Sequence, residues 1–396
     1  MPTVRGKHIV LGVSGSIACY KAIELASKLI QAEAIVHVAM TSEAAQFISP
    51  LTFQSITHRP VARDLFDPGS ELAMDHVALA QKADLIVVAP ATANIIAKLS
   101  HGMADDAVTT TVLASRSPTL IAPAMDGNMW QNHATQENIE RLRSRGVAIA
   151  GPVEGRLASG MLGMGRMIEP LDIVDHIRAT LGFNGDLSGK KIVVSAGGTQ
   201  EPVDPVRVIT NHSSGKMGFA LARAARDQGA STVLITAPTT LHPPVVVEIV
   251  ETKTARDMSA AVEQACEGAD VLIMAAAVSD YRPKVVATQK LKKKRESFSL
   301  ELIKNPDIIT NVKGPIIKIG FAAETQDIVR NARKKMDLKH LDLIVANDIT
   351  DPASGFGSDS NQVIILDRAG NAETLPLLDK GEVAYKVIER VKQLLS

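Results

Sequence analysis

The chain has very few cysteines and no excess charge of either sign. Its 396 residues include only two cysteines, Cys19 and Cys266, and their wide separation argues against a disulfide framework and a cysteine metal site. Lysine plus arginine and aspartate plus glutamate both total 43, so no whole-chain field favours nucleic acid or an anionic membrane. Any anion site must be local, and we expect both cysteines to be buried small apolar residues.

Long hydrophobic runs are also missing. Every strongly apolar run is far shorter than the ~20 residues that a membrane helix needs, and residues 1–7 lack the apolar stretch of a signal peptide. These absences predict a soluble, cytoplasmic protein with no membrane partner. The length of 396 residues exceeds what one hydrophobic core usually organises, so we expect two domains.

Short β-branched runs alternate with helical stretches in both halves of the chain. This alternation predicts two doubly wound, Rossmann-like α/β domains with parallel sheets. A turn-rich segment at 182–189 interrupts the pattern. We therefore predict a first domain at 1–183, a linker at 184–190 and a second domain at 191–396.

A turn rich in glycine and serine follows the first predicted strand. The sequence Gly12-Val13-Ser14-Gly15-Ser16-Ile17-Ala18 opens a helix, so its amides and the helix N-terminus predict a phosphate site. It departs from the three-glycine dinucleotide pattern, and the hydroxyls of Ser14 and Ser16 favour the terminal phosphate of a mononucleotide. The structural alternative is a glycine turn that only packs a strand against a helix.

Two further loops follow predicted strands. They read Ala-Pro-Ala-Thr-Ala-Asn at 89–94 and Ala-Pro-Ala-Met-Asp-Gly-Asn-Met-Trp at 122–130. Open α/β sheets bind ligands at the carboxyl ends of their strands. The three loops therefore predict one composite pocket, in which small side chains let the backbone approach a flat ring.

Together these loops resemble the flavin-containing cysteine decarboxylases. The resemblance implies a flavodoxin-like fold, bound FMN, and decarboxylation of phosphopantothenoylcysteine after oxidation of its thiol. It also implies that His76 is the essential base, a role that suits an imidazole with a pKa near ~6.5. The FMN site that it implies consists of Gly12, Ser14, Gly15, Ser16, Ile17, Thr41, Pro90, Ala91, Thr92, Asn94, Ala124 and Met125.

Two residues depart from that family's pattern. Asp126 stands where the family commonly has Asn, and an ionised carboxylate would repel the substrate carboxylate that the amide binds. We expect Asp126 to be protonated, turned away, or replaced in this role by Asn128. Ser159 stands where the family often has a flap Cys, whose thiol near pKa ~8.5 gives up a proton far more readily than a hydroxyl. We predict that decarboxylation survives, with Ser159 or water relaying the proton.

The second half carries a polar loop immediately before a helix. Residues 204–218 concentrate Arg207, Asn211, two hydroxyls and a Gly-Lys pair, which predicts an anion site. Helix capping would explain Ser213 or Ser214 but not Arg207 and Asn211 together. The basic run at 289–295 is most simply a solvated face, although Lys290 falls where a loop could close over a triphosphate.

Four motifs of this half resemble the bacterial phosphopantothenate–cysteine ligases, in the same order: Asn-His-Ser-Ser-Gly-Lys-Met-Gly, Ala-Ala-Val-x-Asp-Tyr, Lys-Asn-Pro-Asp-Ile and Gly-Phe-Ala-Ala-Glu-Thr. With the first half, the resemblance points to the bifunctional bacterial enzymes of coenzyme A biosynthesis. It implies that CTP with Mg²⁺ activates 4′-phosphopantothenate as an acyl-cytidylate, from which cysteine displaces CMP.

The same resemblance implies a role for particular residues. Asn211 would act in the acyl-intermediate step, Lys290 would stabilise transferring charge, and Asp280 would lie near the ribose, base or metal. The remaining substrate and nucleotide site that it implies consists of Arg207, Ser213, Ser214, Gly215, Lys216, Ala275, Ala276, Asn305, Pro306, Asp307, Ile308, Phe321, Lys335 and Lys339.

The sequence also allows two other hypotheses. The chain could be a ligase only, with a flavin-binding but impaired first domain, as Asp126 and Ser159 would suggest. It could also be a nicotinamide-binding Rossmann protein or a flavin-binding oligomerisation module, which released FMN or NAD(P) would distinguish. The resemblance further implies a homo-oligomer of trimeric decarboxylase units and dimeric ligase domains, while the choice between CTP and ATP stays open.

Overall fold

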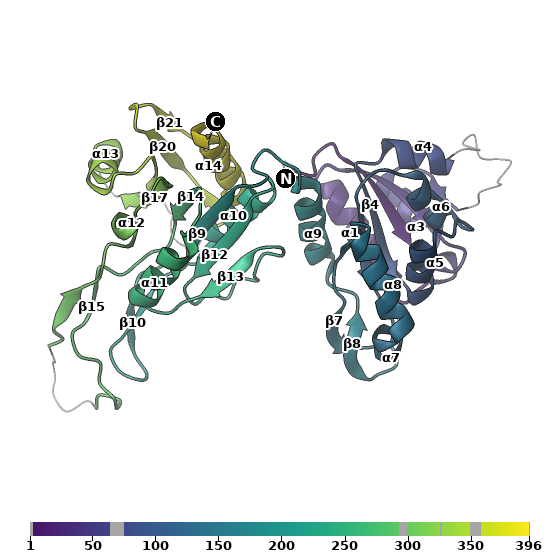
Figure 1. Ribbon diagram of the computed structural model, residues 1–396, viewed down its shortest axis with the longest axis horizontal. Coiled ribbons are helices and arrows are strands. Elements are labelled where there is room, and N and C mark those ends of the chain that lie inside the picture. Colours follow the sequence, from purple (N-terminus) through teal and green to yellow (C-terminus); the bar gives the residue numbers. More distant parts are fainter. Residues whose placement is uncertain (1–2, 64–74, 293–298, 325–326, 349–357, 396) are drawn as a thin grey trace. The chain divides into compact units, whose positions relative to one another are not determined.

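The computed structural model describes residues 3–63, 75–292, 299–324, 327–348 and 358–395. The chain divides into two compact units, Met1–Gly182 and Phe183–Ser396. Figure 1 shows that each unit is a sheet flanked by helices. Across the described ranges, no helix combines the length and the apolar character required to cross a membrane.

The first unit is built on a parallel six-stranded sheet. Its strands are β1 (His8–Val13), β2 (Ile35–Met40), β3 (Val61–Ala62), β4 (Leu85–Ala91), β5 (Thr119–Pro123) and β6 (Ala148–Ile149). Their order in the sheet is β3-β2-β1-β4-β5-β6, and every pairing is parallel. The order reverses between β1 and β4, which is the switch point where such sheets bind ligands. The predicted doubly wound α/β class is confirmed.

Helices cover both faces of this sheet because its strands are apolar on both sides. Along β1, Ile9 and Leu11 belong to one core and Val10 belongs to the opposite one, as expected for buried parallel strands. One face packs against α1 (Cys19–Gln31), α3 (Pro50–Thr57) and α9 (Pro170–Gly182), and the other against α5 (Ala93–His101), α6 (Ala107–Ala114) and α8 (His133–Ser144).

Short elements complete the first unit. These are α2 (Ala44–Phe47), α4 (Asp75–Lys82), α7 (Gly127–Gln131) and a hairpin of β7 (Val153–Arg156) and β8 (Leu162–Arg166). The hairpin extends beyond the sheet beside α7 (Figure 1), where Met125 N donates to the carbonyl oxygen of Gly165 at 3.0 Å. The predicted flap is therefore a β-hairpin attached to the loop after β5.

A stacked histidine pair lies at the amino-terminal end of the first sheet. His8 Nδ1 and His37 Nε2 are 3.3 Å apart, and the rings are nearly parallel with centroids 5.6 Å apart. Burial and, to a smaller extent, the positive charges of Arg59, His8 and Lys82 together lower the pKa of His37 from 6.5 to about 4. The folded unit therefore favours the neutral imidazole of His37.

We expect this preference to make the first unit acid-sensitive. Because the folded pKa of His37 is below the unfolded value, the neutral ring stabilises the fold above pH 6.5, and this contribution is lost as the pH falls towards 4. The free energy of unfolding of the natural unit should fall between about pH 7 and about pH 4.5. In His37→Gln this fall should be smaller by about 2 to 3 kcal/mol. Urea unfolding at both pH values measures this. The same change at exposed His133 should leave the pH dependence unaltered.

The second unit has a mixed eight-stranded sheet. Its strands are β9 (Lys191–Ala196), β12 (Ser231–Thr236), β13 (Glu248–Glu251), β14 (Val271–Met274), β17 (Ile317–Glu324), β18 (Leu343–Asp348), β20 (Val363–Asp367) and β21 (Ala372–Thr374). The order is β13-β12-β9-β14-β17-β18-β20-β21. The pairs from β13 to β18 are parallel, but β20 and β21 pair in antiparallel fashion. The expected second doubly wound sheet is therefore extended by an antiparallel edge.

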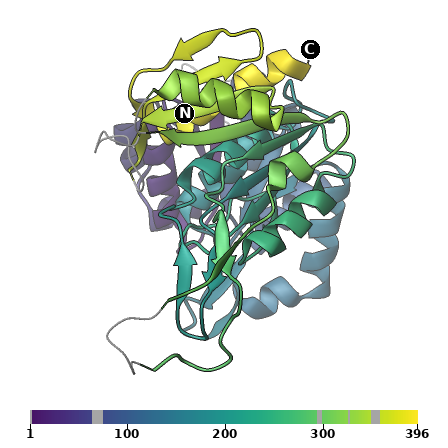
Figure 2. The same cartoon turned by 90° about the vertical axis from the view of Figure 1, so that its left-hand side faces the viewer.

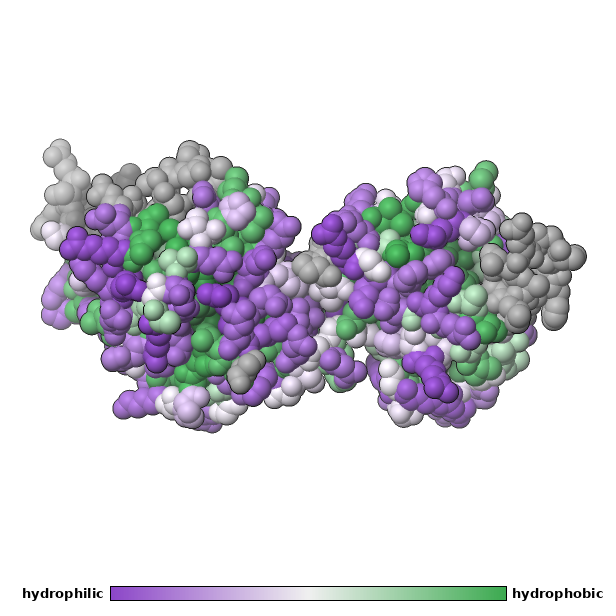
Figure 3. All heavy atoms as spheres, turned by 90° about the horizontal axis from the view of Figure 1, so that it is seen from above, coloured by the Kyte–Doolittle hydropathy of each residue, from purple (hydrophilic) through white to green (hydrophobic). Residues whose placement is uncertain are grey.

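Helices again cover both faces of the sheet. One core joins it to α10 (Lys216–Arg226) and α14 (Lys380–Leu395), and the opposite core joins it to α11 (Ala255–Ala265), α12 (Ile308–Asn311) and α13 (Ile328–Lys339). A short pairing of β19 (Ser360–Asn361) with β22 (Leu378–Asp379) precedes α14. Polar and apolar side chains are interspersed on the face shown in Figure 3, which is ordinary for globular proteins.

Two arms project from one end of the second sheet (Figures 1 and 2). One is the hairpin of β10 (Gln200–Pro202) and β11 (Val208–Thr210), and the other is the hairpin of β15 (Tyr281–Pro283) and β16 (Leu302–Lys304). They lie side by side, since Ala287 N donates to Val203 O at 3.0 Å.

A buried charged cluster fastens α10 to α14. Arg226 and Asp227 are only 3% and 2% exposed, and the Arg226 guanidinium lies 2.6 Å from Asp227 Oδ1. The hydroxyl of Tyr385 on α14 donates to Asp227 Oδ2. Asp227 is therefore shared by two buried partners from different helices. Of the two cysteines, Cys19 is buried as predicted, whereas Cys266 is only partly buried.

Candidate functional site

The turn after β1 presents backbone N–H groups at the switch point of the first sheet. Within the described chain, the N–H groups of Gly15, Ser16 and Ile17 have no hydrogen-bond partner. A Cβ on Gly15 would lie 2.4 Å from the Cβ of Glu43, so only glycine allows the turn to approach the loop after β2. The turn forms a nest of free donors suited to an anion.

Ser14 ties this turn to the loop after β4. Its buried hydroxyl donates to Pro90 O at 2.8 Å and accepts from Thr92 N at 3.1 Å. The hydroxyl of Thr92 in turn accepts from Ile95 N at 3.3 Å, capping α5. The Ser14 hydroxyl thus positions two loops of the predicted FMN site. Gly12 has a packing role, because its added Cβ would lie 2.7 Å from Val108.

A cavity of about 350 Å³ lies at these loops. Glu43 and Asp106 also line it, and the sequence analysis gave them no role. Met129 lines it too, and it belongs to the loop motif at 122–130. Asp106 forms an ion pair with Lys98 at 3.1 Å, so its charge is compensated. Predicted FMN residues that line the cavity are Ser14, Gly15, Ser16, Thr41, Thr92, Asn94, Ala124 and Met125. The donor nest and this cavity fit a mononucleotide with a terminal phosphate.

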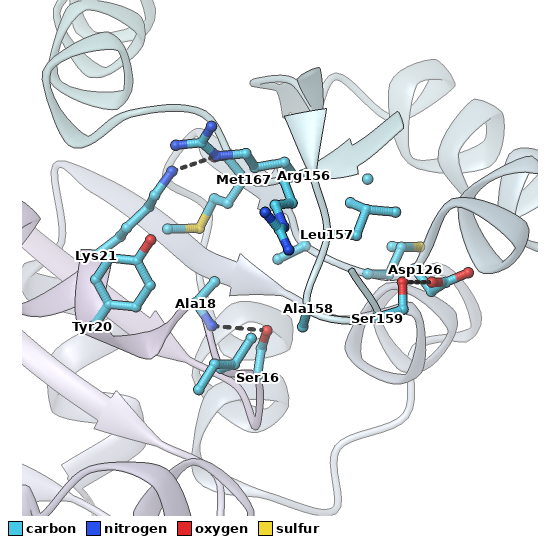
Figure 4. Close-up of a pocket in the computed structure, with 15 residues that line it drawn as sticks. Ser16, Ala18, Tyr20, Lys21, Asp126, Arg156, Leu157, Ala158, Ser159 and Met167 are labelled. Carbon is cyan, nitrogen blue, oxygen red and sulfur yellow. Dashed lines mark hydrogen bonds between the residues drawn. The ribbon is translucent and has the colours of Figure 1, made fainter. Parts of the chain in front are cut away.

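A second cavity of about 630 Å³ adjoins the first, and the two share Ser16, Ala124 and Met125. It lies between the start of α1, the loop after β5 and the β7–β8 hairpin (Figure 4). Ile17, Asp126 and Ser159 from the predicted site line it. Lining residues without a predicted role are Ala18, Tyr20, Lys21, Arg156, Leu157, Ala158, Gly165, Arg166 and Met167.

Asp126 and Ser159 contact each other in this cavity. Ser159 Oγ donates to Asp126 Oδ2 at 3.0 Å, and Asp126 Oδ1 accepts from Asn128 N at 3.0 Å as the cap of α7. Figure 4 shows the pair at one side of the cavity. The two departures from the family pattern are therefore coupled, and Asp126 is held towards the hairpin. The exposed Asn128 contributes only its backbone to this arrangement.

His76 belongs to α4, but its side chain lies outside the described residues. Its role as the base of the first domain therefore stays a prediction.

In the second unit, the loops after β9 and β14 meet at the switch point. Ala276 N donates to Ser195 Oγ at 3.1 Å, and Ser279 N donates to Thr199 Oγ1 at 3.0 Å. Asn211 approaches the same loop, since its Nδ2 donates to Val278 O at 3.2 Å. The polar loop before α10 is thus joined to the Ala-Ala-Val-x-Asp-Tyr motif.

A cavity of about 330 Å³ opens beside the loop after β14. Lys335 and Lys339 reach it from α13, and Lys339 Nζ lies 3.0 Å from Asp307 Oδ2. Asn305 Nδ2 donates to Ser279 O at 2.8 Å, and this hydrogen bond joins the loop after β16 to the loop after β14. Nine predicted nucleotide-site residues line the cavity: Ala276, Asp280, Asn305, Pro306, Asp307, Ile308, Phe321, Lys335 and Lys339.

The hydroxyl of Ser279 is an unusual feature of this cavity. Ser279 is 3% exposed, and its Oγ has no hydrogen-bond partner within the described part of the chain. Buried hydroxyls are normally paired. A ligand in the cavity would supply the missing partner, a signal that the sequence does not reveal.

The other predicted residues of this domain do not line the cavity. Ala275, Ser213, Ser214 and Gly215 belong to loops beside the switch point, and Lys216 begins α10. Gly215 N donates to Ser213 Oγ at 3.4 Å, and Thr239 Oγ1 donates to Ser214 O at 3.1 Å. Lys216 forms an ion pair with the exposed Asp359 at 2.7 Å.

Arg207 and the segment that carries Lys290 are joined through Asp204. The buried carboxylate of Asp204 accepts from Val206 N, Arg207 N and Leu291 N at 2.8, 2.9 and 3.1 Å. Burial would raise the pKa of Asp204, but these backbone donors hold it below its usual value. Arg207 also donates to Leu291 O at 2.6 Å. The sequence analysis gave Asp204 no role, because its partner Leu291 lies 87 residues further along the chain.

Comparisons with known proteins agree with this two-part architecture. Residues 2–182 match the family model described as Flavoprotein, and residues 187–395 match the model described as DNA/pantothenate metabolism flavoprotein C-terminal domain. The chain is 44% identical to the coenzyme A biosynthesis bifunctional protein CoaBC of Vibrio parahaemolyticus over the whole of both chains. It belongs to the CoaBC family.

The CoaBC relatives include proteins of Vibrio and Bacillus species. The Bacillus subtilis protein of that name is 43% identical, over 99% of this chain and 98% of its own length. A solved C-terminal domain of a CoaBC protein is 39% identical and covers 53% of this chain and 98% of its own, with a TM-score of 0.46. Because the two full-length relatives match 100% and 99% of this chain, both of its units lie within the CoaBC family.

The described residues include no group of three or more His, Cys, Asp or Glu side chains that could hold a metal ion. Asp280 lines the cavity of the second unit, and its role near a metal stays a prediction. Triphosphate oxygens are suitable ligands for Mg²⁺, which often keeps few protein ligands.

Proposed function

We propose that this chain carries out two consecutive steps of coenzyme A biosynthesis. The second domain ligates cysteine to 4′-phosphopantothenate with CTP, and the first domain decarboxylates the resulting phosphopantothenoylcysteine to 4′-phosphopantetheine. The observation that carries the proposal is the placement of the predicted residues. Nine residues from the loops after β14 and β16, from α12, from β17 and from α13 line one cavity in the second unit.

The ligation half depends on charge and positioning. Lys335 and Lys339 present cations from one face of α13 to the cavity, where they would bind the nucleotide phosphates. Asn211 would orient the acyl intermediate from the switch point, and the Asp204 junction would keep Arg207 beside the Lys290 segment. Lys290 is exposed on its arm, so it would reach from solvent the negative charge that develops on the α-phosphate as the cytidylyl group is transferred and pyrophosphate leaves.

The decarboxylation half uses the two adjoining cavities of the first unit. The free N–H groups of residues 15–17 would bind the phosphate of FMN, and bound FMN would supply the redox chemistry of the substrate thiol. Loss of CO₂ replaces a carbon–carbon bond by a carbon–hydrogen bond, so a proton donor is required at that carbon. Ser159 would relay this proton, and Asp126 would position its hydroxyl through the 3.0 Å hydrogen bond.

Several finer properties belong to the same proposal. We infer FMN, CTP and Mg²⁺ as the cofactor set, with Asp280 near the metal, and a homo-oligomer built from trimeric first domains and dimeric second domains. A cytoplasmic location follows from the proposed use of CTP. Two measurements test this cofactor set. The denatured protein should release FMN, and the native protein should form CMP from CTP but no AMP from ATP. Released NAD(P) would contradict it.

Gly15→Ala should deprive the first domain of its flavin. The added methyl group would lie 2.4 Å from the Cβ of Glu43, and backbone atoms on both sides would have to move. We expect at least a tenfold fall in FMN content per chain, measured by absorbance of the purified protein. Gly163→Ala, where the added Cβ would meet only the side chain of Leu157 at 3.8 Å, controls for general loss of glycine. Unchanged flavin content in Gly15→Ala would contradict the assignment of this turn.

Ser279→Ala should weaken nucleotide binding without weakening the fold. Its hydroxyl has no partner within the described chain, so removal costs no internal hydrogen bond. A lost contact to the ligand corresponds to about 1 kcal/mol, or roughly a fivefold rise in the Kd for CTP. Calorimetric titration measures the Kd, and thermal unfolding without nucleotide gives the control. Reduced stability with unchanged affinity would show that the hydroxyl is structural.

A further inference from the structure

Three cationic side chains line the 630 Å³ cavity of the first unit, but only two of them have compensated charges. Lys21 Nζ donates to Met167 O at 2.7 Å and lies 2.9 Å from Glu169 Oε1. Arg166 lies 2.6 Å from the same carboxylate oxygen. Glu169 therefore serves as the counter-ion for both Lys21 and Arg166.

Arg156 is the third cation, and it differs from the other two. It ends β7, and its guanidinium has no hydrogen bond or ion pair with any described residue. Figure 4 shows its side chain extending from the hairpin, between the Asp126–Ser159 pair and the end of the cavity that holds Lys21. The cavity thus contains one uncompensated guanidinium group, opposite a loop shared with the predicted FMN cavity.

The dimensions and chemistry of the cavity fit a long substrate with an anionic end. A volume of about 630 Å³ lies within the usual range of ligand pockets. Ile17, Leu157 and Met167 supply apolar surface along it. The Asp126–Ser159 pair lies beside the loop after β5, where the reacting end would meet the flavin. The Arg156 guanidinium lies away from that pair, where it would meet the other, anionic end of the substrate.

We propose that Arg156 binds the phosphate group of the phosphopantothenoyl substrate and makes the first domain select phosphorylated over unphosphorylated molecules. This inference rests on the proposed decarboxylase function. A guanidinium presents parallel N–H donors that match two phosphate oxygens, and such charge-assisted pairs are stronger than neutral hydrogen bonds. Arg156 is a specificity-determining residue, since it acts on the part of the substrate that does not react.

The first test compares two ligands that differ only by the phosphate group. Binding of 4′-phosphopantetheine and of pantetheine to the flavin-loaded protein is measured by titration calorimetry, for the natural chain and for Arg156→Met. The natural chain should prefer the phosphorylated ligand by roughly 10- to 100-fold, and Arg156→Met should lose most of this preference. Pantetheine affinity should change by less than about twofold. Arg156→Lys, which keeps the charge but loses the paired donors, should retain part of the preference.

Matched controls separate this effect from a change of fold or net charge. Arg143→Met removes an exposed cation that pairs with Glu140 on α8, and it should leave the preference intact. FMN content and CMP formation should be unaltered in Arg156→Met. A natural chain without preference, or an Arg156→Met variant that keeps it, would overturn the inference even if decarboxylation is observed. Selective binding without any decarboxylation would instead refute the proposed function.

Discussion

Replacing Ser159 with alanine should lower the rate of phosphopantetheine formation by roughly 10²-fold. The cavity of the first unit places the Ser159 hydroxyl 3.0 Å from Asp126 Oδ2, as the hydroxyl that would relay a proton to the decarboxylated carbon. Without it, the decarboxylated ene-thiol should accumulate, because CO₂ loss does not require the hydroxyl but protonation does. Mass spectrometry of quenched single-turnover reactions measures the substrate, the ene-thiol and the product together.

The second activity of the same chain provides the control for this variant. CMP formation should be equal in the natural protein and in Ser159→Ala, since ligation takes place in the other unit. Ser159→Cys should be at least as fast as the natural protein, because a thiol gives up its proton more readily. Asp126→Asn tests the partner, and removal of its charge should lower the KM for phosphopantothenoylcysteine. Unchanged turnover in Ser159→Ala would assign the proton to water.

Replacing Asp227 with alanine should destabilise the second unit by about 3–5 kcal/mol. The variant would leave the guanidinium of Arg226, only 3% exposed, without its buried counter-ion. It would also remove the acceptor of the Tyr385 hydroxyl and so loosen α14 from α10. Urea unfolding followed by far-UV circular dichroism should show an earlier transition for this unit. FMN release, which follows the first unit, should be unaffected.

Two comparisons show whether burial causes that effect. Asp227→Asn keeps the shape and an acceptor but removes the charge, so it should be less destabilising than alanine. Glu389→Ala removes a half-exposed carboxylate that pairs with Lys392 at 3.1 Å on α14, and its effect should stay below about 1 kcal/mol. Equal effects at Asp227 and Glu389 would mean that the buried cluster contributes no more than a surface pair.

The sequence predicts the parallel cores of both units because their strands are apolar on both faces. Ile9, Val10 and Leu11 are consecutive and all buried, which excludes a strand with one face in water. The loops at the carboxyl ends follow from the same pattern, since parallel strands end at one edge. The order of strands and loops along the chain thus places Ser16 and Met125 at the same edge of the sheet, although 109 residues separate them.

Other features depend on contacts that no local pattern encodes. The antiparallel edge of the second sheet is made by β20 and by β21, whose three residues are all exposed and form no apolar run. Asp204 reaches Leu291 across 87 residues, and Lys21 reaches Met167 across 146. Their polar partners are backbone atoms, which any residue type supplies. Sequence reasoning therefore found the loops of the site but missed the side chains that fix them.

The most direct test of the account is the product formed from 4′-phosphopantothenate, cysteine, CTP and Mg²⁺ by the purified protein without added flavin. We expect 4′-phosphopantetheine with stoichiometric CMP and CO₂, identified by mass spectrometry. Phosphopantothenoylcysteine that accumulates without CO₂ would show a ligase with a silent first domain. Absence of CMP would contradict the proposed function as a whole.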